Sequence, residues 1–141
     1  MEWYINYYKN IMMTDIQNRK DIHLIITLFY DKLLADCVVK HFFEDIVAKN
    51  YLTEHIDTVT DFWNGILFQA TDYKGNAMRP HLLLNRKKPF EKQHFKRWLH
   101  LFHTTIDENF TGQKAEMAKT RALSIATIME IKIHEQNKLL Q

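Results

Sequence analysis

One of the eight histidines in this chain of 141 residues lies in a segment that suits metal chemistry. His81 follows Pro80 and precedes three leucines, so a short apolar segment carries a single imidazole. Proline is favoured in the first turn of a helix, where its fixed backbone angle would hold the ring rigidly. Such an imidazole could be an axial ligand to iron, although taken alone the motif favours a buried, hydrogen-bonded histidine.

A second histidine lies on the apolar face of a predicted helix. His55 comes four residues before Val59 and eight before Trp63, which is the spacing of one helix face. A histidine on that face needs a polar partner or a ligand, because burying an unpaired polar group costs free energy. Four other histidines have charged or polar neighbours, and we expect them at the surface: His23, His41, His94 and His134.

Helices must position these side chains, because apolar residues recur at spacings of three and four along most of the chain. Asp21 is expected to cap the first helix, whose apolar face would run from Ile22 to Leu33. Turn residues and Pro89 separate the later segments. We expect helices over about 21–33, 36–48, 52–70 and 91–109, a brief helix around His81, and a last long helix after Gly112.

The scarcity of turn-forming residues excludes several fold classes. Three glycines and two prolines are too few for an all-β sandwich or barrel. Gly65, Gly75 and Gly112 are too far apart for the glycine-rich loops that cradle nucleotides. With 46% hydrophobic and 26% charged residues, the chain is predicted to be one all-α domain.

Charge and hydropathy argue against nucleic-acid and membrane partners. The net charge of +2 is too small for a nucleic-acid-binding surface, and no apolar run approaches the length of a membrane span. No secretory signal is visible, and the single cysteine cannot form an internal disulfide, so we expect a cytoplasmic protein. Because Cys37 adjoins two valines, we expect it to be a small core residue and not a nucleophile.

Aromatic residues make up 13% of the chain and lie on the predicted helix faces. Facing stripes of phenylalanine and tryptophan can pack against each other, or they can surround a flat apolar ligand. Spacing alone does not decide between these two outcomes, and simple packing is the more common one.

A set of motifs follows in order from about Asp21 to Met129: Leu28-Phe29-Tyr30 with Leu33 and Asp36; Phe42-Phe43; His55 followed by Phe62-Trp63-Asn64-Gly65; Tyr73-Lys74-Gly75; His81-Leu82; and Phe95-Lys96-Arg97-Trp98-Leu99-His100-Leu101-Phe102. In their order and spacing, these motifs resemble the truncated haemoglobins, and specifically their group III branch. Each motif is weak by itself, whereas the ordered set is specific. The chain lacks the adjacent glycines of many truncated haemoglobins, a lack that is least surprising in group III.

The resemblance implies a two-over-two α-helical sandwich that holds one haem b. By position, His81 matches the proximal iron ligand of the family, Tyr30 matches the distal tyrosine and His55 matches the distal histidine. Trp98 matches the tryptophan that lies near the bound gas, and Phe43 matches the phenylalanine that packs on the haem face.

Further apolar walls of the implied haem pocket would come from Phe62, Trp63 and Phe95. Donors from the Tyr30 hydroxyl and the Trp98 indole would stabilise a bound gas that carries partial negative charge. An arginine or lysine could pair with a haem propionate, and the sequence does not indicate which one.

Two functional hypotheses follow from the resemblance. In the first, the protein reversibly binds dioxygen or another diatomic gas, such as nitric oxide or carbon monoxide, at a distal pocket of Tyr, His and Trp. In the second, it is a haem-dependent redox enzyme that detoxifies nitric oxide or peroxide with a separate reductase. A helical interaction module without a cofactor is a third reading, which the complete set of motifs disfavours.

We expect residues 1–13 to be an N-terminal extension and residues 14–141 to be the truncated globin domain. The extension carries four aromatic residues without a helical period that continues onward, and two methionines directly precede Thr14. It is therefore expected to be partly ordered at best, or to come from an upstream start. A monomer is the plain expectation for the domain.

Overall fold

The computed structural model describes residues 1–140, and over that range the chain contains helices and no strands. Seven α-helices and one 3-10 helix follow one another there: α1 (Glu2–Met12), α2 (Arg19–Ala35), η1 (Lys40–Phe43), α3 (Glu44–Ala48), α4 (Leu52–Phe68), α5 (Met78–Lys87), α6 (Lys92–Asn109) and α7 (Gln113–Leu139). The predicted all-α class is confirmed. None of the described helices combines the length and the apolar character that crossing a membrane requires.

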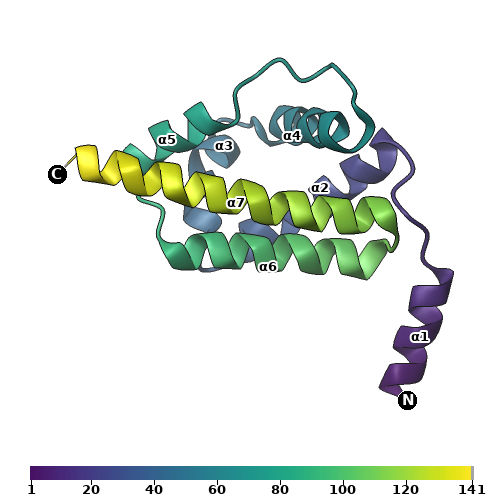
Figure 1. The fold of residues 1–141 in the computed structure, drawn as a ribbon. Coiled ribbons are helices and arrows are strands. Elements are labelled where there is room, and N and C mark those ends of the chain that lie inside the picture. The colour runs from purple at the N-terminus through teal and green to yellow at the C-terminus, as the bar shows by residue number, and fades with distance from the viewer. Residues whose placement is uncertain (141) are drawn as a thin grey trace.

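Four long helices form two layers around one core. α2 packs against α4, and α6 packs against α7. Figure 1 shows α6 and α7 running side by side in opposite directions, with α2 passing behind them. Because α2 also packs on α6, and α4 on α7, one pair lies over the other. This arrangement confirms the predicted two-over-two sandwich.

The core lies between the two layers, where the helices direct their periodic apolar side chains. Leu33 of α2 and Ile106 of α6 are completely buried. Phe102 of α6 stacks on Trp63 of α4 with a ring-centroid distance of 4.9 Å. Small residues such as the buried Ala122 let α7 approach its neighbours closely. Burying each large apolar side chain stabilises the fold by about 1.5–3 kcal/mol.

A side-chain cap begins α2, three residues earlier than predicted. The Oδ1 atom of Asn18 accepts a hydrogen bond from the backbone N–H of Asp21 at 3.1 Å, so Asn18 is the N-cap. The expectation that Asp21 is the cap is therefore wrong. Asp21 lies in the first turn, where its carboxylate accepts from the backbone N–H of Gln17 at 2.9 Å.

Asp15 joins the start of the sandwich to the start of α7. Its carboxylate accepts hydrogen bonds from the backbone N–H groups of Lys114 and Ala115, each at 2.9 Å. A Cβ atom at Gly112 would collide with this carboxylate, and the φ angle of 141° at Gly112 also favours glycine. The chain from Asp15 onward is thus tied to the body.

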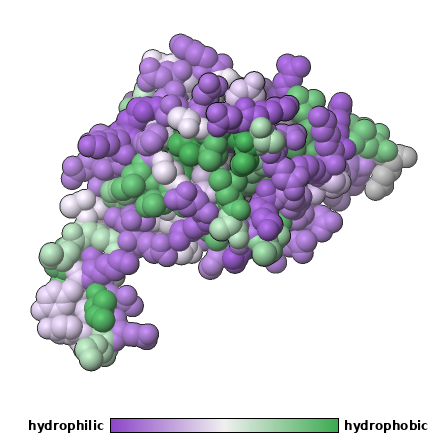
Figure 2. Space-filling view, turned by 180° about the vertical axis from the view of Figure 1, so that it is seen from behind, coloured by the Kyte–Doolittle hydropathy of each residue, from purple (hydrophilic) through white to green (hydrophobic). Residues whose placement is uncertain are grey.

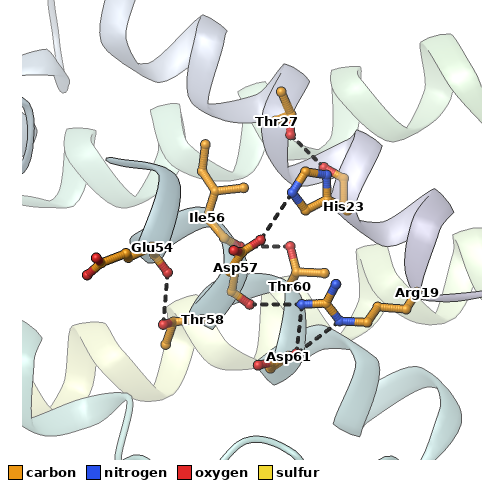
Figure 3. A network of polar contacts seen from close by, with 9 residues as sticks. All are labelled: Arg19, His23, Thr27, Glu54, Ile56, Asp57, Thr58, Thr60 and Asp61. Carbon is orange, nitrogen blue, oxygen red and sulfur yellow. Dashed lines mark hydrogen bonds and ion pairs between the residues drawn. The ribbon is translucent and has the colours of Figure 1, made fainter. Parts of the chain in front are cut away.

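Polar side chains link α2 to α4 along an outer edge of the sandwich (Figure 3). Arg19 of α2 pairs with Asp61 of α4 at 2.9 Å and also donates to the carbonyl oxygen of Asp57 at 3.5 Å. One helical turn further on, His23 faces the carboxylate of Asp57 at 3.3 Å. These side chains are partly exposed, so each pair contributes about 0–1 kcal/mol.

The segment after α2 differs from the predicted helix over 36–48. η1 and α3 cover only its later part, because α2 ends at Asp36 in a turn. The Asp36 carboxylate accepts from the backbone N–H of Val38 at 2.9 Å and pairs with Arg97 of α6 at 2.6 Å. This ion pair connects the end of α2 to the opposite layer.

The same turn corrects the expectation for Cys37. The side chain of Val39 enters the core and is 3% exposed, whereas Cys37 is exposed. Successive side chains of a turn point in different directions, so apolar neighbours in sequence did not imply burial.

α1 stands apart from the sandwich. Figure 1 shows it projecting from the N-terminal end of the body, and Figure 2 shows apolar side chains on its uncovered surface. Trp3, for example, is 72% exposed. The first backbone contact with the body is made by Thr14, whose carbonyl oxygen accepts from the N–H of Thr111 at 3.0 Å.

Candidate functional site

A cavity of about 370 Å³ lies within the sandwich, a volume typical of ligand-binding pockets. Each helix after α1 contributes to its lining, which is mostly aromatic and aliphatic: Phe29, Tyr30, Val39, Phe42, Phe43, Ile46, His55, Thr58, Val59, Phe62, Trp63, Tyr73, Ala77, Pro80, His81, Leu84, Phe90, His94, Phe95, Trp98, Ile125, Ala126 and Met129. The residues predicted from the sequence all belong to this set. The fold therefore brings them to one cavity.

Tyr30 and His55 form a hydrogen-bonded pair at this cavity. Tyr30 extends from α2 and His55 from α4, and the phenol oxygen lies 2.6 Å from Nε2. Burial raises the pKa of Tyr30 far above its ordinary value, so the hydroxyl keeps its proton. Burial, and to a lesser degree the nearby His81, lowers the pKa of His55 below 6.5. The pair is therefore uncharged at neutral pH, and each group can donate or accept.

His81 lies in the first half of α5, and one of its ring nitrogens is held by the backbone. Nδ1 lies 2.6 Å from the carbonyl oxygen of Ala77. Because a carbonyl only accepts, Nδ1 carries the proton and Nε2 keeps its lone pair. His81 borders the cavity and is exposed by surface area, while the side chains around the ring desolvate it in part, which lowers the pKa of His81 below 6.5. The result is a neutral imidazole with one nitrogen oriented and the other available, as in metal-binding histidines.

Side-chain hydrogen bonds also fix the first turn of α5, the helix that carries His81. The Asn76 side chain accepts hydrogen bonds from the backbone N–H groups of Met78 at 3.0 Å and Arg79 at 3.3 Å. These bonds cap the first turn of α5 and connect it to the loop that follows α4.

His94 lines the cavity and is 9% exposed, so the expectation that it lies at the surface is wrong. Its Nδ1 accepts from the backbone N–H of Glu91 at 2.8 Å, which forms part of the capping box of α6. The sequence spacing could have indicated this position, because His94 precedes Trp98 by four residues and therefore lies on the same helix face. Of the other histidines expected at the surface, His134 is exposed, and His23 and His41 are half-buried.

Aromatic rings form much of the remaining wall. Phe43 meets Tyr30 edge to face at 5.5 Å. Trp98 lies 5.6 Å from Phe29 and stacks in parallel with Phe102 at 5.5 Å. Edge-to-face and offset contacts of this kind are favourable arrangements for aromatic pairs, so they hold these rings in defined orientations.

Loop residues complete the wall and were not predicted. Tyr73, between α4 and α5, lies 5.3 Å from Phe62, and Phe90, between α5 and α6, stacks on Phe42 at 4.3 Å. Helical periodicity carries no information about side chains outside helices, so the spacing of apolar residues did not indicate where these two rings lie.

Comparison with known proteins gives the same family in sequence and in structure. No protein-family model matches the chain. It is 27% identical over 124 residues to a group 3 truncated hemoglobin of Campylobacter jejuni, a match that covers 86% of this chain and 91% of that protein. The crystal structure of a group III truncated hemoglobin from Campylobacter jejuni is similar with a TM-score of 0.77 and 25% identity, over 86% of this chain and 95% of the other. The resemblance of this chain to the group III truncated haemoglobins is therefore confirmed, and its fold is that of a truncated globin.

Proposed function

We propose that this chain is a haem protein whose cavity holds one haem b, with Nε2 of His81 as the protein's ligand to the iron. The contact between His81 and Ala77 carries the proposal, because it orients Nδ1 at 2.6 Å and leaves Nε2 available. The aromatic and aliphatic lining suits a flat porphyrin. The similarity to truncated hemoglobins supports the same assignment.

When bound, the haem would supply an iron that can accept a diatomic gas. The walls of the cavity exclude water, and the apolar side chains that we assign to this role are Phe43, Phe62, Trp63 and Phe95. The protein would thus bind dioxygen, or another diatomic gas such as nitric oxide or carbon monoxide, reversibly.

The polar side chains of the cavity determine how long the gas stays bound. We assign Tyr30 and Trp98 as hydrogen-bond donors, since an O–H or N–H group favours a ligand that gains electron density. Each donor contributes about 0.5–1.5 kcal/mol net. Such bonds exist only when the gas is present, so they slow its release more than they change its capture.

The tautomer of His55 decides which donor is free. If Nε2 accepts, the Tyr30 hydroxyl is already engaged at 2.6 Å and the Trp98 indole is the available donor. If Nε2 carries the proton, it donates to the phenol oxygen, and the hydroxyl proton can turn toward the gas. His55 therefore controls the donor strength of Tyr30 through one hydrogen bond.

Absorption spectra test the haem assignment. The purified full chain, supplied with haemin, should show a strong Soret band that shifts on reduction and again on addition of carbon monoxide. A colourless protein that takes up no haemin would contradict the proposal, and the aromatic faces would then be a packed core only.

A haem-dependent redox enzyme that detoxifies nitric oxide or peroxide with a separate reductase is the second candidate. The Tyr30–His55 hydrogen bond favours it, because a hydroxyl and an imidazole in contact can hold and pass a proton at the cavity. Nitric oxide loss that is rapid and requires a reductant would support the enzyme. Slow gas release without turnover would support the carrier.

A further inference from the structure

α5 is attached to the sandwich in an unusual way. Over residues 1–140, the one side chain of α5 that is fully buried is a polar one, Asn85, which is 2% exposed. By contrast, α2, α6 and α7 each bury three or more apolar side chains, and α4 buries Trp63 and Leu67. α5 packs chiefly against α7, and Figure 1 shows it beside the C-terminal half of that helix. Apolar packing alone therefore does not hold the helix that carries His81.

A polar cluster at the end of α7 supplies the attachment. The side-chain amide of Asn85 donates to Oε1 of Gln136 at 2.7 Å and to Oδ1 of Asn137 at 2.8 Å. In return, Gln136 Nε2 donates to the carbonyl oxygen of Leu82 at 3.1 Å. We call these three side chains, Asn85, Gln136 and Asn137, the amide clasp.

The amide clasp also reaches the loop after α5. The Oδ1 atom of Asn85 accepts from the backbone N–H of Phe90 at 2.8 Å. The ring of Phe90 lies 6.2 Å from that of His81 and stacks on Phe42. Both donors and the acceptor of the Asn85 amide are thus engaged, and one buried side chain joins α5, the loop wall of the cavity and α7.

We propose that the amide clasp positions His81. It fixes the rotation of α5 about its axis and the position of α5 along that axis, and thereby determines where Nε2 of His81 lies in the cavity. Two features support this role. Asn85 follows His81 by one helical turn, and Gln136 binds the carbonyl of Leu82, the residue directly after His81. Hydrogen bonds are directional, so a satisfied buried amide network specifies one arrangement, whereas apolar side chains allow a helix to slide and repack.

The proposal rests on the proposed haem site, and it names positioning residues that do not touch the haem themselves. It also gives a reason for the length of α7, which continues over 27 residues to Leu139. Its last turns are needed to hold α5, even though they lie beyond the core shared with α6.

The test compares Asn85→Leu, which keeps a similar shape and removes the amide, with Gln136→Met and Asn137→Ala. Glu135→Gln is the matched control, since Glu135 lies on the same turn of α7, is exposed and pairs with Lys132, which lies outside the amide clasp. Three quantities are measured: transfer of haemin from the loaded protein to excess apomyoglobin, the iron–imidazole stretching band of the reduced protein, and hydrogen exchange of α5 amides in the haem-free chain.

We expect Asn85→Leu to release haemin about tenfold faster than the unmodified chain and to shift or broaden the iron–imidazole band. The α5 amides should exchange about tenfold faster, while those of α2 and α6 stay unchanged. Gln136→Met and Asn137→Ala should give smaller effects of the same kind, and the control should give none.

Haemin release, band position and α5 exchange that all remain within about twofold of the unmodified chain would overturn the proposal. If Asn85→Leu does not fold, the two α7 variants decide, because the substituted residues, Gln136 and Asn137, are half-buried and each variant leaves the other hydrogen bond of the Asn85 amide in place. If the unmodified chain takes up no haemin, the proposed function fails, and hydrogen exchange still tests whether the amide clasp holds α5.

Discussion

The helices that carry Tyr30 and His55 are held differently from the helix that carries His81. α2 and α4 pack against each other, and both bury large apolar side chains, such as Phe29 of α2 and Trp63 of α4. α5 is shorter and depends on the amide clasp at Asn85. The Tyr30 side of the cavity is therefore built into the core, whereas the His81 side is attached to it by polar contacts.

This difference in attachment suggests that the two sides of the cavity have different roles. On our proposal, the core-built side sets how a gas is held, and the attached side sets how the haem is held. Variants on the two sides should then change different measured quantities, and the following predictions test that separation, from the largest expected effect to the smallest.

Removing the imidazole of α5 should have the largest effect. His81→Ala should weaken haemin affinity by about a hundredfold or more, because the iron loses its bond to the protein. Haemin titration followed at the Soret band measures this, with His134→Ala as the control at an exposed histidine. Full haem retention with an unchanged spectrum would contradict the ligand assignment.

Removing the donors of the core-built side should change gas release and leave haem affinity nearly unchanged. Tyr30→Phe combined with Trp98→Phe should speed dioxygen dissociation by about ten- to a hundredfold, since two hydrogen bonds are lost. Stopped-flow measurement gives the rate, and Tyr51→Phe, at an exposed tyrosine, is the control. An unchanged rate would show that the donors do not reach the gas.

The ion pair between Asp36 and Arg97 should stabilise the core-built side in a pH-dependent way. The hydrogen bond from Arg97 lowers the pKa of the Asp36 carboxyl below 3.8. The ion pair therefore contributes its full stability above pH 3.8, and this stability is lost as the pH falls through the lowered pKa. At pH 7, Asp36→Asn should lower the free energy of unfolding by about 1–3 kcal/mol. Urea unfolding at neutral and acid pH measures this, and Asp107→Asn, at an exposed pair, should show little change. An equal loss at both pH values would contradict the role of the charge.

Acidification should destabilise the haem-free chain through histidines on both sides. Desolvation lowers the pKa of His55, His81 and His94 below 6.5, so the unfolded chain binds more protons and stability falls as the pH drops below that value. The share of His81 should be reduced by solvent screening, because that residue is exposed by surface area. Urea unfolding of His55→Gln and His81→Gln should show which side contributes more. Each variant should reduce the slope of the unfolding free energy against pH by the contribution of the histidine that it removes. Slopes identical to that of the unmodified chain would contradict the lowered pKa values of these two histidines.

The N-terminal helix should have the smallest effect. We propose that the globin domain begins at residue 14, since Thr14 and Asp15 make the first bonds to the body. Deleting residues 1–13 should change the free energy of unfolding by less than about 0.5 kcal/mol. Deleting residues 1–16 should cost about 2 kcal/mol or more, because the α7 cap and the buried Ile16 are lost. Equal effects of the two deletions would place the boundary elsewhere.

Sequence reasoning succeeded where a side chain lies on a regular helix. The apolar period placed Leu33 and Phe102 on core faces, and both are buried. It failed at helix ends and turns, where the backbone changes direction: Cys37 is exposed, and the cap of α2 is Asn18. For His94, local polarity suggested the surface, whereas its helix face determined its burial.

The sequence by itself determined the long helices of the sandwich, their buried faces and the ordered motifs that resemble a truncated globin, because these depend mainly on residues three and four apart. Only the tertiary structure decided that Tyr30 and His55 touch, that Ala77 orients the ring of His81, and that Asn85 binds the end of α7. The amide clasp, for example, joins residues 51 and 52 positions apart. Local periodicity carries no information about such separations, which are set by how whole helices pack.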